Sequence, residues 1–344
     1  MFYIVLDGMI QKIKEISEYK TNDDYVYCFE MKNKSEPYFT LPNGIITHNC
    51  RLRSDMINEY SNSIGGTSTK IGSLGVVTIN LPRLAYESKT EEDFFKLLEE
   101  RVIEVAYINN AKRHILKRRI SYGALPLYDL GFMNLNQQYS TCGINGLNEC
   151  VSYMGFDILN NDGQQFVIKI LDCINKVNDS MKKQYSTPHN TEQTPSENSA
   201  LKLVKKDRYM GFNVDTDMYS NQFIPLTVNA DMLERIKLQG LFDKHFSGGA
   251  ICHINVSEKI EDKELIKDLI RTCAKQNVIY FAINYCLNRC ENDHMTVGNM
   301  DICSICGKKI VEKYTRVVGF LTNTKNWNVI RREKDFPNRQ WYKI

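Results

Sequence analysis

The chain has 344 residues, of which 42% are hydrophobic and 25% are charged, so it can bury a core and form two or more structural units. Its 44 basic residues nearly cancel its 41 acidic ones, and the net charge of +3 gives no reason to expect nucleic acid or a membrane surface as a partner. No apolar run approaches the roughly 20 residues needed to cross a bilayer, and the N-terminus lacks the residue order of a signal peptide. We therefore expect a cytoplasmic protein.

The N-terminal segment differs in composition from the rest of the chain. Residues 9–49 are rich in Lys, Glu, Asn and Tyr, carry short β-prone runs such as YVYCFEM, and contain a turn signal at Pro42-Asn43-Gly44. After Cys50 the sequence is rich in Gly and small residues, and the β-prone run VVTIN then stops at Pro82. We predict a small β-rich piece over 9–49 and, before Pro82, a strand flanked by loops.

Helical and β-prone segments alternate through the middle of the chain. Thr90 precedes a long run with apolar residues at helical spacing, and Asp93 is placed to support an N-cap. The polar segment 184–200 is predicted to be a loop, too long to serve only as a connection. An α/β layer architecture is predicted by the alternation of further amphipathic and β-prone segments, which lie at 163–183, 250–256, 258–275 and 278–284.

The tripeptide His48-Asn49-Cys50 has the chemistry of a protein-splicing junction. An Asn amide can attack its own backbone carbonyl and cleave the chain, if a neighbouring imidazole polarises the peptide, and Asn49 and His48 supply these groups. Cys50 supplies a thiolate that can take over an acyl group from an upstream segment. Taken alone, the tripeptide fits an ordinary turn better.

Residues 9–49 resemble the C-terminal segment of an intein, with Tyr38-Phe39, Asn43-Gly44 and a terminal His-Asn before a nucleophile. Two departures, Cys28 where many inteins have Asp and Pro37 where His is usual, bear on how cleavage is assisted. The resemblance implies that residues 1–49 are an intein fragment that splicing removes. It also implies splicing in trans with a separate polypeptide that carries the N-terminal half.

A cluster of cysteines near the C-terminus indicates a metal site. The chain has eleven cysteines, and without a secretion signal they are normally kept reduced, which favours metal or radical chemistry over disulfides. Cys303 and Cys306, followed by Gly307, form a C-x2-C-G knuckle that can hold one side of a tetrahedral metal. Four ligands without an open position indicate structural zinc, and unrelated buried thiols are the alternative. The best tetrad is Cys290, His294, Cys303 and Cys306, with Cys286 as the replacement for His294.

Gly319 lies in the middle of the apolar run RVVGFL, after the cysteine cluster. Glycine in a strand usually marks a bulge or a close backbone approach. The chemical alternative is that glycine, which has no side chain, can lose a Cα hydrogen and become planar, so that an unpaired electron spreads over both flanking amides. The residue types alone leave both interpretations open.

The C-x2-C-G knuckle, RVVGF, the later NWN and the tail RQWYKI resemble the glycyl-radical end of anaerobic, class III ribonucleotide reductases. Essentially all of 50–344 shares the resemblance, with Phe320 where Tyr is common. It implies that Gly319 stores a radical installed by a radical-SAM activating enzyme, and that Cys50, in a Cys-Arg-Leu-Arg segment, relays it as a thiyl radical. Other matching segments are TINLPRLA, STCGINGLNE, PSENSA, YSNQFIPL and GGAICHINV.

The resemblance also implies a fold and a substrate site. Residues 50–284 would form the second half of a ten-stranded α/β barrel, closed by a zinc ribbon at 285–310 and a glycyl-radical segment at 311–344. We expect Cys142 to be a packing residue, and His114 and His253 to be surface or core residues, rather than catalysts. For Asn80, a purely structural role at the end of its strand is the alternative to substrate binding. Backbone N–H groups in turns can cradle anions, and the expected substrate-binding residues are Asn80, Ser140, Gly143, Asn145, Asn148, Pro195, Glu197 and Ser199.

The implied reaction is anaerobic reduction of ribonucleoside triphosphates to deoxyribonucleotides, by a homodimer that is inactive without its N-terminal reductase half. Two other classes of function remain open. One is another glycyl-radical enzyme of the formate-lyase or dehydratase type, which the preceding zinc ribbon argues against. The other is a non-enzymatic zinc-ribbon interaction protein. The flanks of the ribbon show no basic stripe with interleaved aromatics, so direct nucleic-acid binding is not expected.

Overall fold

The computed structural model describes residues 3–6, 9–12, 39–40, 46–47 and 72–344. The first four ranges are short strands, which pair antiparallel as β1 with β2 and β3 with β4. Short strands were predicted here, but the YVYCFEM run and the turn at 42–44 lie outside the described residues. The bounds are β1 (Tyr3–Leu6), β2 (Met9–Lys12), β3 (Phe39–Thr40) and β4 (Ile46–Thr47).

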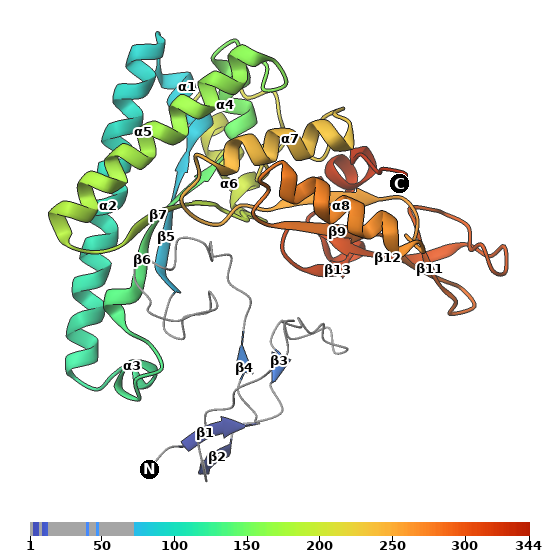
Figure 1. The fold of residues 1–344 in the computed structure, drawn as a ribbon, viewed down its shortest axis with the longest axis horizontal. Coiled ribbons are helices and arrows are strands. Elements are labelled where there is room, and N and C mark those ends of the chain that lie inside the picture. Colours follow the sequence, from blue (N-terminus) through green and yellow to red (C-terminus); the bar gives the residue numbers. More distant parts are fainter. Residues whose placement is uncertain (1–2, 7–8, 13–38, 41–45, 48–71) are drawn as a thin grey trace.

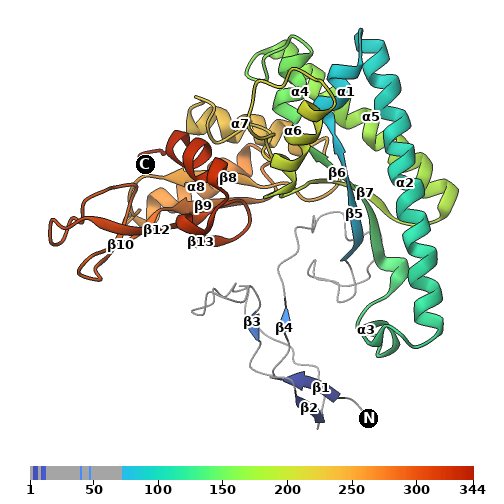
Figure 2. The same ribbon diagram turned by 180° about the vertical axis from the view of Figure 1, so that it is seen from behind.

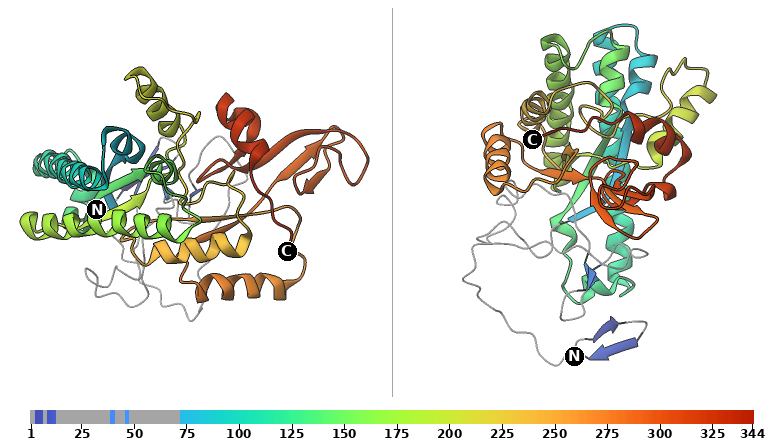
Figure 3. Two further views of the ribbon diagram at one scale, coloured as in Figure 1. Left: turned by 90° about the horizontal axis from the view of Figure 1, so that it is seen from above. Right: turned by 90° about the vertical axis from the view of Figure 1, so that its right-hand side faces the viewer.

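Three parallel strands, in the order β5-β6-β7, form the first large sheet. The long helices α2 and α5 pack against each other and lie on the same side of this sheet (Figures 1 and 3). Each helix belongs to a connection between neighbouring strands, as parallel pairing requires. The elements are β5 (Gly72–Asn80), α1 (Leu81–Glu87), α2 (Glu91–Ser121), α3 (Pro126–Asp129), η2 (Leu135–Gln137), β6 (Gln138–Asn145), α4 (Leu147–Tyr153), α5 (Asn161–Tyr185), β7 (His189–Gln193) and α6 (Ser199–Tyr209).

Local sequence signals account for most of these elements. The predicted cap at the start of α2 is confirmed, because the Thr90 hydroxyl accepts a hydrogen bond of 3.1 Å from the Asp93 amide. Two predictions were wrong. The strand before Pro82 is not followed by a loop, since α1 begins at once and tolerates Pro82 in its first turn. The segment 184–200 is not only a loop, since it contains β7.

The three-stranded sheet has an apolar face and a polar face. Side chains alternate along each strand, and Ile79, Cys142 and Ile144 point toward α2 and α5 and share one core with them. Cys142 is therefore a packing residue, as predicted. The opposite face is largely polar, although every residue of β6 is buried. We call this surface the polar face, and its members are Thr78, Asn80, Thr141, Gly143, Asn145, Asn190 and Glu192.

A second parallel sheet repeats this division. It pairs β8 with β9, and its apolar side packs against helices through Ile254, Leu269 and Cys273. Its other side carries His253 and polar neighbours, and Asn284 Nδ2 lies 2.8 Å from His253 Nδ1. His253 is thus a buried, hydrogen-bonded residue, as expected. The elements are α7 (Met232–Asp243), β8 (Cys252–Val256), α8 (Lys263–Lys275) and β9 (Phe281–Tyr285).

The C-terminal strands form an antiparallel sheet in the order β11-β10-β12-β13. Figure 2 shows this sheet at the end of the molecule remote from α2 and α5. Strand β12 begins at Ile310, so the sheet continues across the boundary expected between the zinc ribbon and the radical segment. The elements are β10 (Leu287–Cys290), β11 (Met295–Val297), β12 (Ile310–Arg316), β13 (Leu321–Asn323), η3 (Thr324–Asn326), the π-helical η4 (Arg331–Asp335) and η5 (Phe336–Asn338).

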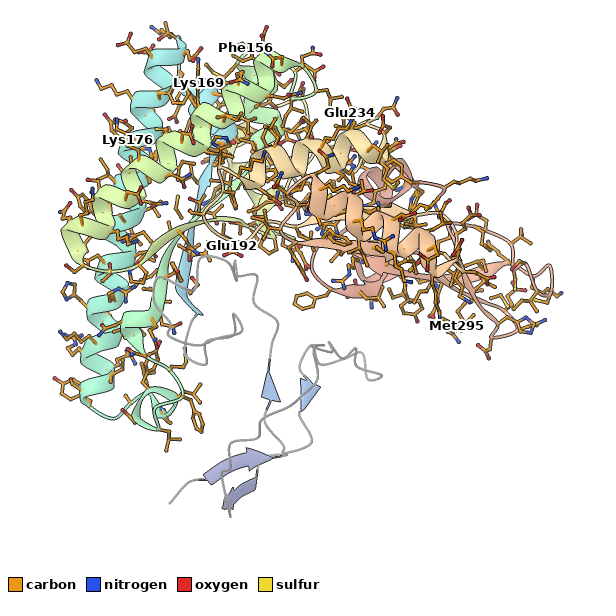
Figure 4. All side chains as sticks on the ribbon, in the orientation of Figure 1. Phe156, Lys169, Lys176, Glu192, Glu234 and Met295 are labelled. Carbon is orange, nitrogen blue, oxygen red and sulfur yellow. The ribbon has the colours of Figure 1, made fainter. Side chains whose placement is uncertain are left out.

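Ion pairs on the surface join the two long helices. Figure 4 labels Lys169 and Lys176 on α5, and these side chains pair with Glu91 at 2.7 Å and Glu99 at 3.4 Å on α2. Exposed pairs of this kind contribute little, typically about 0–1 kcal/mol each, so the buried core holds the helices together. In the part of the chain that the structure describes, no helix has the length and apolar character needed to span a bilayer.

His189, at the start of β7, makes the stability of this sheet sensitive to acid. Both of its ring nitrogens are buried without a hydrogen-bond partner in the described part of the chain. Burial, followed by the charges of Arg113 and Lys182, lowers the pKa of His189 from 6.5 to about 4. The unfolded chain therefore binds more protons between these pH values, and the free energy of unfolding should fall by about 2 kcal/mol as pH drops from about 6.5 to about 4.

His189→Leu should remove that part of the pH dependence, as measured by urea unfolding at a series of pH values. His114 lies on an exposed face of α2 and supplies the matched control, because His114→Leu should leave the pH dependence unchanged. An unchanged pH profile in His189→Leu would contradict the assignment.

Candidate functional site

The carboxyl ends of β5, β6 and β7 bring polar groups together at one edge of the polar face. Asn80 and Asn145 are the last residues of their strands and are direct neighbours in the register of the sheet. Gln193 ends β7 and is the register neighbour of Ile144. In open parallel α/β sheets, ligands bind outside this edge because the loops and helix N-termini gather there.

The amide of Asn80 is held in one orientation. Asp207 of α6 is fully buried and accepts a hydrogen bond of 2.7 Å from Asn80 Nδ2. The same carboxylate accepts from Arg83 Nε at 2.7 Å and from the Tyr219 hydroxyl at 2.6 Å. Because an ionised carboxylate only accepts, it selects the NH2 side of the amide. Asn80 Oδ1 is buried and has no hydrogen-bond partner among the described residues, which leaves it as an acceptor for a further donor.

Asn145 repeats this arrangement. Its Nδ2 donates to the Ser220 carbonyl at 2.9 Å, while its Oδ1 is buried and has no partner within the described ranges. Gly143 lies on β6, the middle strand of the sheet. A Cβ at this position would come 2.6 Å from the Thr78 hydroxyl and would also overlap Thr194. The edge therefore combines two amide oxygens that need donors with a position that admits only glycine.

Two residues expected in this site lie elsewhere. Ser140 is on the side of β6 that faces α2, and its hydroxyl accepts from Arg113 Nη2 at 3.2 Å. The strand alternation that brings Gly143 and Asn145 to the polar face turns Ser140 away from it, so its inclusion was wrong. Asn148 is half-buried within α4, after the turn that follows β6.

The turn after β7 presents the other expected residues at the start of α6. Ser196 is buried in a left-handed conformation, with φ 47°, and its hydroxyl has no hydrogen-bond partner in the part of the chain that the structure describes. Glu197 Oε1 is likewise buried without one. The Pro195 carbonyl accepts from Asn221 Nδ2 at 2.7 Å, and Ser199 is the first helical residue. The N–H groups of this first turn and the positive end of the helix dipole favour an anion.

Gly319 lies in the loop that joins β12 to β13, not inside a strand, so the bulge interpretation is wrong. Its carbonyl accepts a hydrogen bond of 2.7 Å from Arg316 Nη1. The loop is closed by a bond of 3.2 Å from the Val317 amide to the Phe320 carbonyl. Gly319 is half-buried, between buried Val318 and exposed Phe320. The glycine is thus held on a short loop whose carbonyl groups are fixed by side chains.

The predicted cysteine–histidine tetrad is brought together in the structure. Cys290, His294, Cys303 and Cys306 each offer a ligand atom, and these atoms lie within 4.8 Å of one another. Two tight turns present them, one through Asp293 at φ 60° and one through Gly307 at φ 69°. The sulfur atoms of Cys290 and Cys306 are 3.7 Å apart. Zn–S bonds of about 2.3 Å in a tetrahedron place two sulfur atoms about 3.8 Å apart, so the group fits zinc.

Cys303, a member of the tetrad, and Cys286, the alternative ligand, differ in the pKa of their thiols. Burial acts to raise the pKa of Cys303, but backbone N–H groups of Ile305 and Cys306 hydrogen-bond the sulfur and bring the pKa down to about 6. Burial raises the pKa of Cys286 to about 11, and its thiol packs in a separate cluster with Val318 and Trp327. Among the described residues, the group of ligand atoms within 4.8 Å of one another contains His294 and not Cys286, so Cys286 does not replace His294 in it.

Comparison with known proteins agrees with these features. The sequence profile of the anaerobic ribonucleoside-triphosphate reductase family matches residues 8–342. The chain belongs to this family. Among curated members, the reductase of Enterobacteria phage T4 is 26% identical over 285 residues, which cover 73% of this chain and 45% of the phage protein. The reductase of Haemophilus influenzae is 24% identical over 284 residues, covering 72% of this chain and 39% of that protein.

Solved structures of the reductase family share the fold of this chain. An anaerobic ribonucleotide reductase superposes with a TM-score of 0.73 at 40% identity, covering 80% of this chain and 45% of the other. The Thermotoga maritima enzyme with glycerol in its active site gives a TM-score of 0.70 at 40% identity, covering 80% of this chain and 47% of that one. The chain thus spans less than half the length of the reductases it matches.

Several residues of the site gave no signal in the sequence. Asp207 resembles a surface residue of an amphipathic helix, and Arg83 lies in the matching segment TINLPRLA, but nothing there singled it out as a site residue. Arg331, Asp335 and Arg339 lie in the polar C-terminal tail. There the resemblance to the family was noticed through the aromatic residues and not through these charged ones. Their roles depend on contacts with distant parts of the chain. His48, Asn49 and Cys50 lie outside the described residues.

Proposed function

We propose that residues 50–344 are the C-terminal part of an anaerobic ribonucleoside-triphosphate reductase, which converts ribonucleoside triphosphates to deoxyribonucleotides by radical chemistry. The observation that carries this proposal is the edge formed by Asn80 and Asn145, two oriented amides with open acceptors on a buried polar face. Such oxygens suit hydroxyl groups of a ribose, which donate hydrogen bonds. The family match over nearly the whole chain supports the same reaction class.

The substrate phosphates would bind at the N-terminus of α6. That helix follows the end of β7 after a short turn, and the Ser196 hydroxyl in this turn has no hydrogen-bond partner among the residues described. Helix N-termini bind phosphate because their first N–H groups have no partner within the helix. Pro195, Glu197 and Ser199 shape this turn, while Gly143 leaves room for the Thr78 and Thr194 hydroxyls, which lie against it 3.1 Å apart.

Gly319 and Cys50 would carry the radical. Loss of one Cα hydrogen atom leaves an electron on Gly319 that both neighbouring amides share. This carbon then takes a hydrogen atom from the Cys50 thiol, which restores glycine and leaves the unpaired electron on sulfur. The sulfur in turn removes the 3′-hydrogen of the ribose, and the 2′-hydroxyl leaves as water. An external reductant, formate or a thiol system, supplies two electrons, and the thiol returns its hydrogen atom to C3′, which restores the radical on sulfur. These steps need close approach and exclusion of water.

The remaining roles belong to structure and assembly. Zinc at the tetrad would brace the ribbon, since four protein ligands leave no position for a substrate. We further propose that the parallel sheets are part of the ten-stranded barrel, which the N-terminal reductase half completes, and that the enzyme is a homodimer activated by a radical-SAM enzyme. Residues 1–49 would be an intein fragment that leaves Cys50 at the splice junction.

Reconstitution tests the proposal as a whole. The chain is co-expressed with a polypeptide that carries the N-terminal reductase and intein halves, and the products are analysed by mass spectrometry. We expect a ligated protein whose second part begins at Cys50, and after anaerobic activation it should form deoxyribonucleotides. Asn49→Ala, which removes the amide nucleophile, should block ligation. No ligation in the unmodified chain would remove the intein proposal, and a ligated, activated protein without turnover would remove the reductase proposal.

A further inference from the structure

Three charged side chains of the C-terminal segment form a buried cluster. Asp335 accepts a bond of 3.1 Å from Arg331 Nη1 and one of 2.7 Å from Arg339 Nη2. The exposed fractions of the side chains are 3% for Arg331, 5% for Asp335 and 2% for Arg339. The π-helical η4 spaces the first two residues, and helical segments of this type often occur at functional sites. One carboxylate thus joins two guanidinium groups away from water.

Arg339 fixes the start of the loop that carries Gly319. Its Nη1 donates to the Arg316 carbonyl at 2.7 Å and its Nη2 to the Val317 carbonyl at 2.9 Å. The guanidinium also lies over the Trp327 ring, 4.9 Å from the centroid. Arg316 in turn binds the Gly319 carbonyl. The position of the glycine therefore depends on Arg339 through two successive contacts.

Arg331 fixes the turn before α6. Its Nε donates to the Glu197 carbonyl at 2.8 Å and its Nη2 to the Ser196 carbonyl at 3.3 Å. Ser196 is in the left-handed region, which a non-glycine residue occupies only when its surroundings hold it there. Arg331 is therefore one of the groups that keep this turn in place.

We propose that Arg331, Asp335 and Arg339 are positioning residues that hold the Gly319 loop and the 195–197 turn in one fixed relation. The inference rests on the proposed function, in which one element carries the radical and the other binds substrate phosphate. The two guanidinium groups donate hydrogen bonds to backbone carbonyls of these two elements and to one shared carboxylate. Movement of either element therefore displaces a guanidinium bound to the Asp335 carboxylate, which also orients the guanidinium that holds the other element.

The chemistry of the cluster argues for a rigid link. A guanidinium presents several N–H donors in one plane, so one Arg can bind a carboxylate and two carbonyls at fixed angles, whereas a lysine amine cannot. The two positive charges exceed the one negative charge, and four backbone carbonyl oxygens, together with the nearby Glu197, offset the excess. Removing one partner leaves a buried charge unpaired, so the cluster is expected to loosen as a unit.

Hydrogen–deuterium exchange of the full chain tests the link without any radical chemistry. Arg339→Lys keeps the charge but loses the planar donors, and it should speed exchange about tenfold in peptides that cover 316–321. The decisive expectation is that peptides covering 195–202, on the far side of Asp335, also exchange faster by a similar factor. Asp335→Asn should produce both changes with almost no change of shape.

Arg332 supplies the matched control, because it neighbours Arg331 but is exposed and pairs only with Glu333 and the Lys325 carbonyl among its described contacts. Arg332→Lys should leave both regions unchanged. Faster exchange at 316–321 alone in Arg339→Lys, with 195–202 as in the parent chain, would overturn the proposal. If Arg339→Lys gives no folded protein, Arg331→Lys tests the link from the other end and should loosen 316–321 as well.

A second measurement separates this inference from the proposed function. In the reconstituted and activated enzyme, Arg339→Lys should retain a glycyl EPR signal but lower turnover at least about tenfold, with the loss in kcat rather than in KM. An unchanged kcat would contradict the positioning role. Absence of the EPR signal in the parent enzyme would count against the radical function instead, and the exchange result would still stand.

Discussion

Gly319→Ala is expected to abolish both the EPR doublet and ribonucleotide reduction in the reconstituted, activated enzyme. The radical on glycine is stabilised by a planar Cα shared between two amides, and a methyl group there crowds the neighbouring carbonyls of a loop that Arg316 and Arg339 hold in place. The loss should reach the detection limit of both assays, because no other residue in RVVGFL lacks a side chain. Anaerobic EPR and product analysis by chromatography are the measurements.

Phe320→Tyr is the matched control for this substitution. Phe320 adjoins the glycine and its side chain is 43% exposed, so a hydroxyl can be added without burying a polar group. The variant should keep the doublet and most of the activity. A doublet that survives Gly319→Ala would remove Gly319 as the radical residue. It would favour the non-enzymatic zinc-ribbon interpretation only if turnover were also absent from the parent enzyme.

Removal of zinc should unfold the C-terminal antiparallel sheet. The tetrad joins the end of β10 to the knuckle before β12, and the buried residues beside it are few, chiefly Ile310 and the ligands themselves. In small zinc modules the metal contributes about 10–16 kcal/mol to folding, which exceeds what so small a core can replace. Chelation should therefore speed amide exchange in 287–316 by orders of magnitude and leave β5, β6 and β7 protected.

Cys303→Ser and Cys286→Ser provide a matched pair for the metal prediction. The first removes a ligand and should lower the zinc content well below one per chain, as measured by atomic emission. The second changes a buried thiol that packs against Trp327 outside the tetrad, so it should retain the metal with a small loss of stability. A full complement of zinc in Cys303→Ser would contradict the assignment of the ligands.

The sequence was most informative where the signal is local. Thr90 and the apolar spacing after it predicted α2, and the short spacing between Cys290 and Cys306 predicted the tetrad, because neighbours in sequence form these features. The side of the sheet that each strand residue faces was harder to predict. Ser140 was grouped with Gly143 because the segment was interpreted as one small-residue loop, whereas it forms strand β6, in which residues three apart face opposite sides.

Contacts between distant residues were beyond prediction. Asp207 binds Asn80 and Arg83, more than a hundred residues earlier in the chain, and nothing near Asp207 marks it as their partner. The same holds for Arg331, which reaches Ser196 and Glu197 across a similar separation. Charged residues in polar segments are usually solvated, and only the folded structure shows that these are buried.

Both parallel sheets place their apolar sides beneath helices and their polar sides on the opposite surface, and this arrangement predicts two zones in a mutational scan. On the apolar sides, where Ile144 and Ile254 pack, truncation to Ala should lower the free energy of unfolding by about 2–5 kcal/mol and reduce the amount of folded protein. On the polar side, at Asn80 or Asn145, conservative changes should leave the amount of soluble protein nearly unchanged while reducing activity. Abundance and catalysis would thus report on opposite surfaces of the same strands.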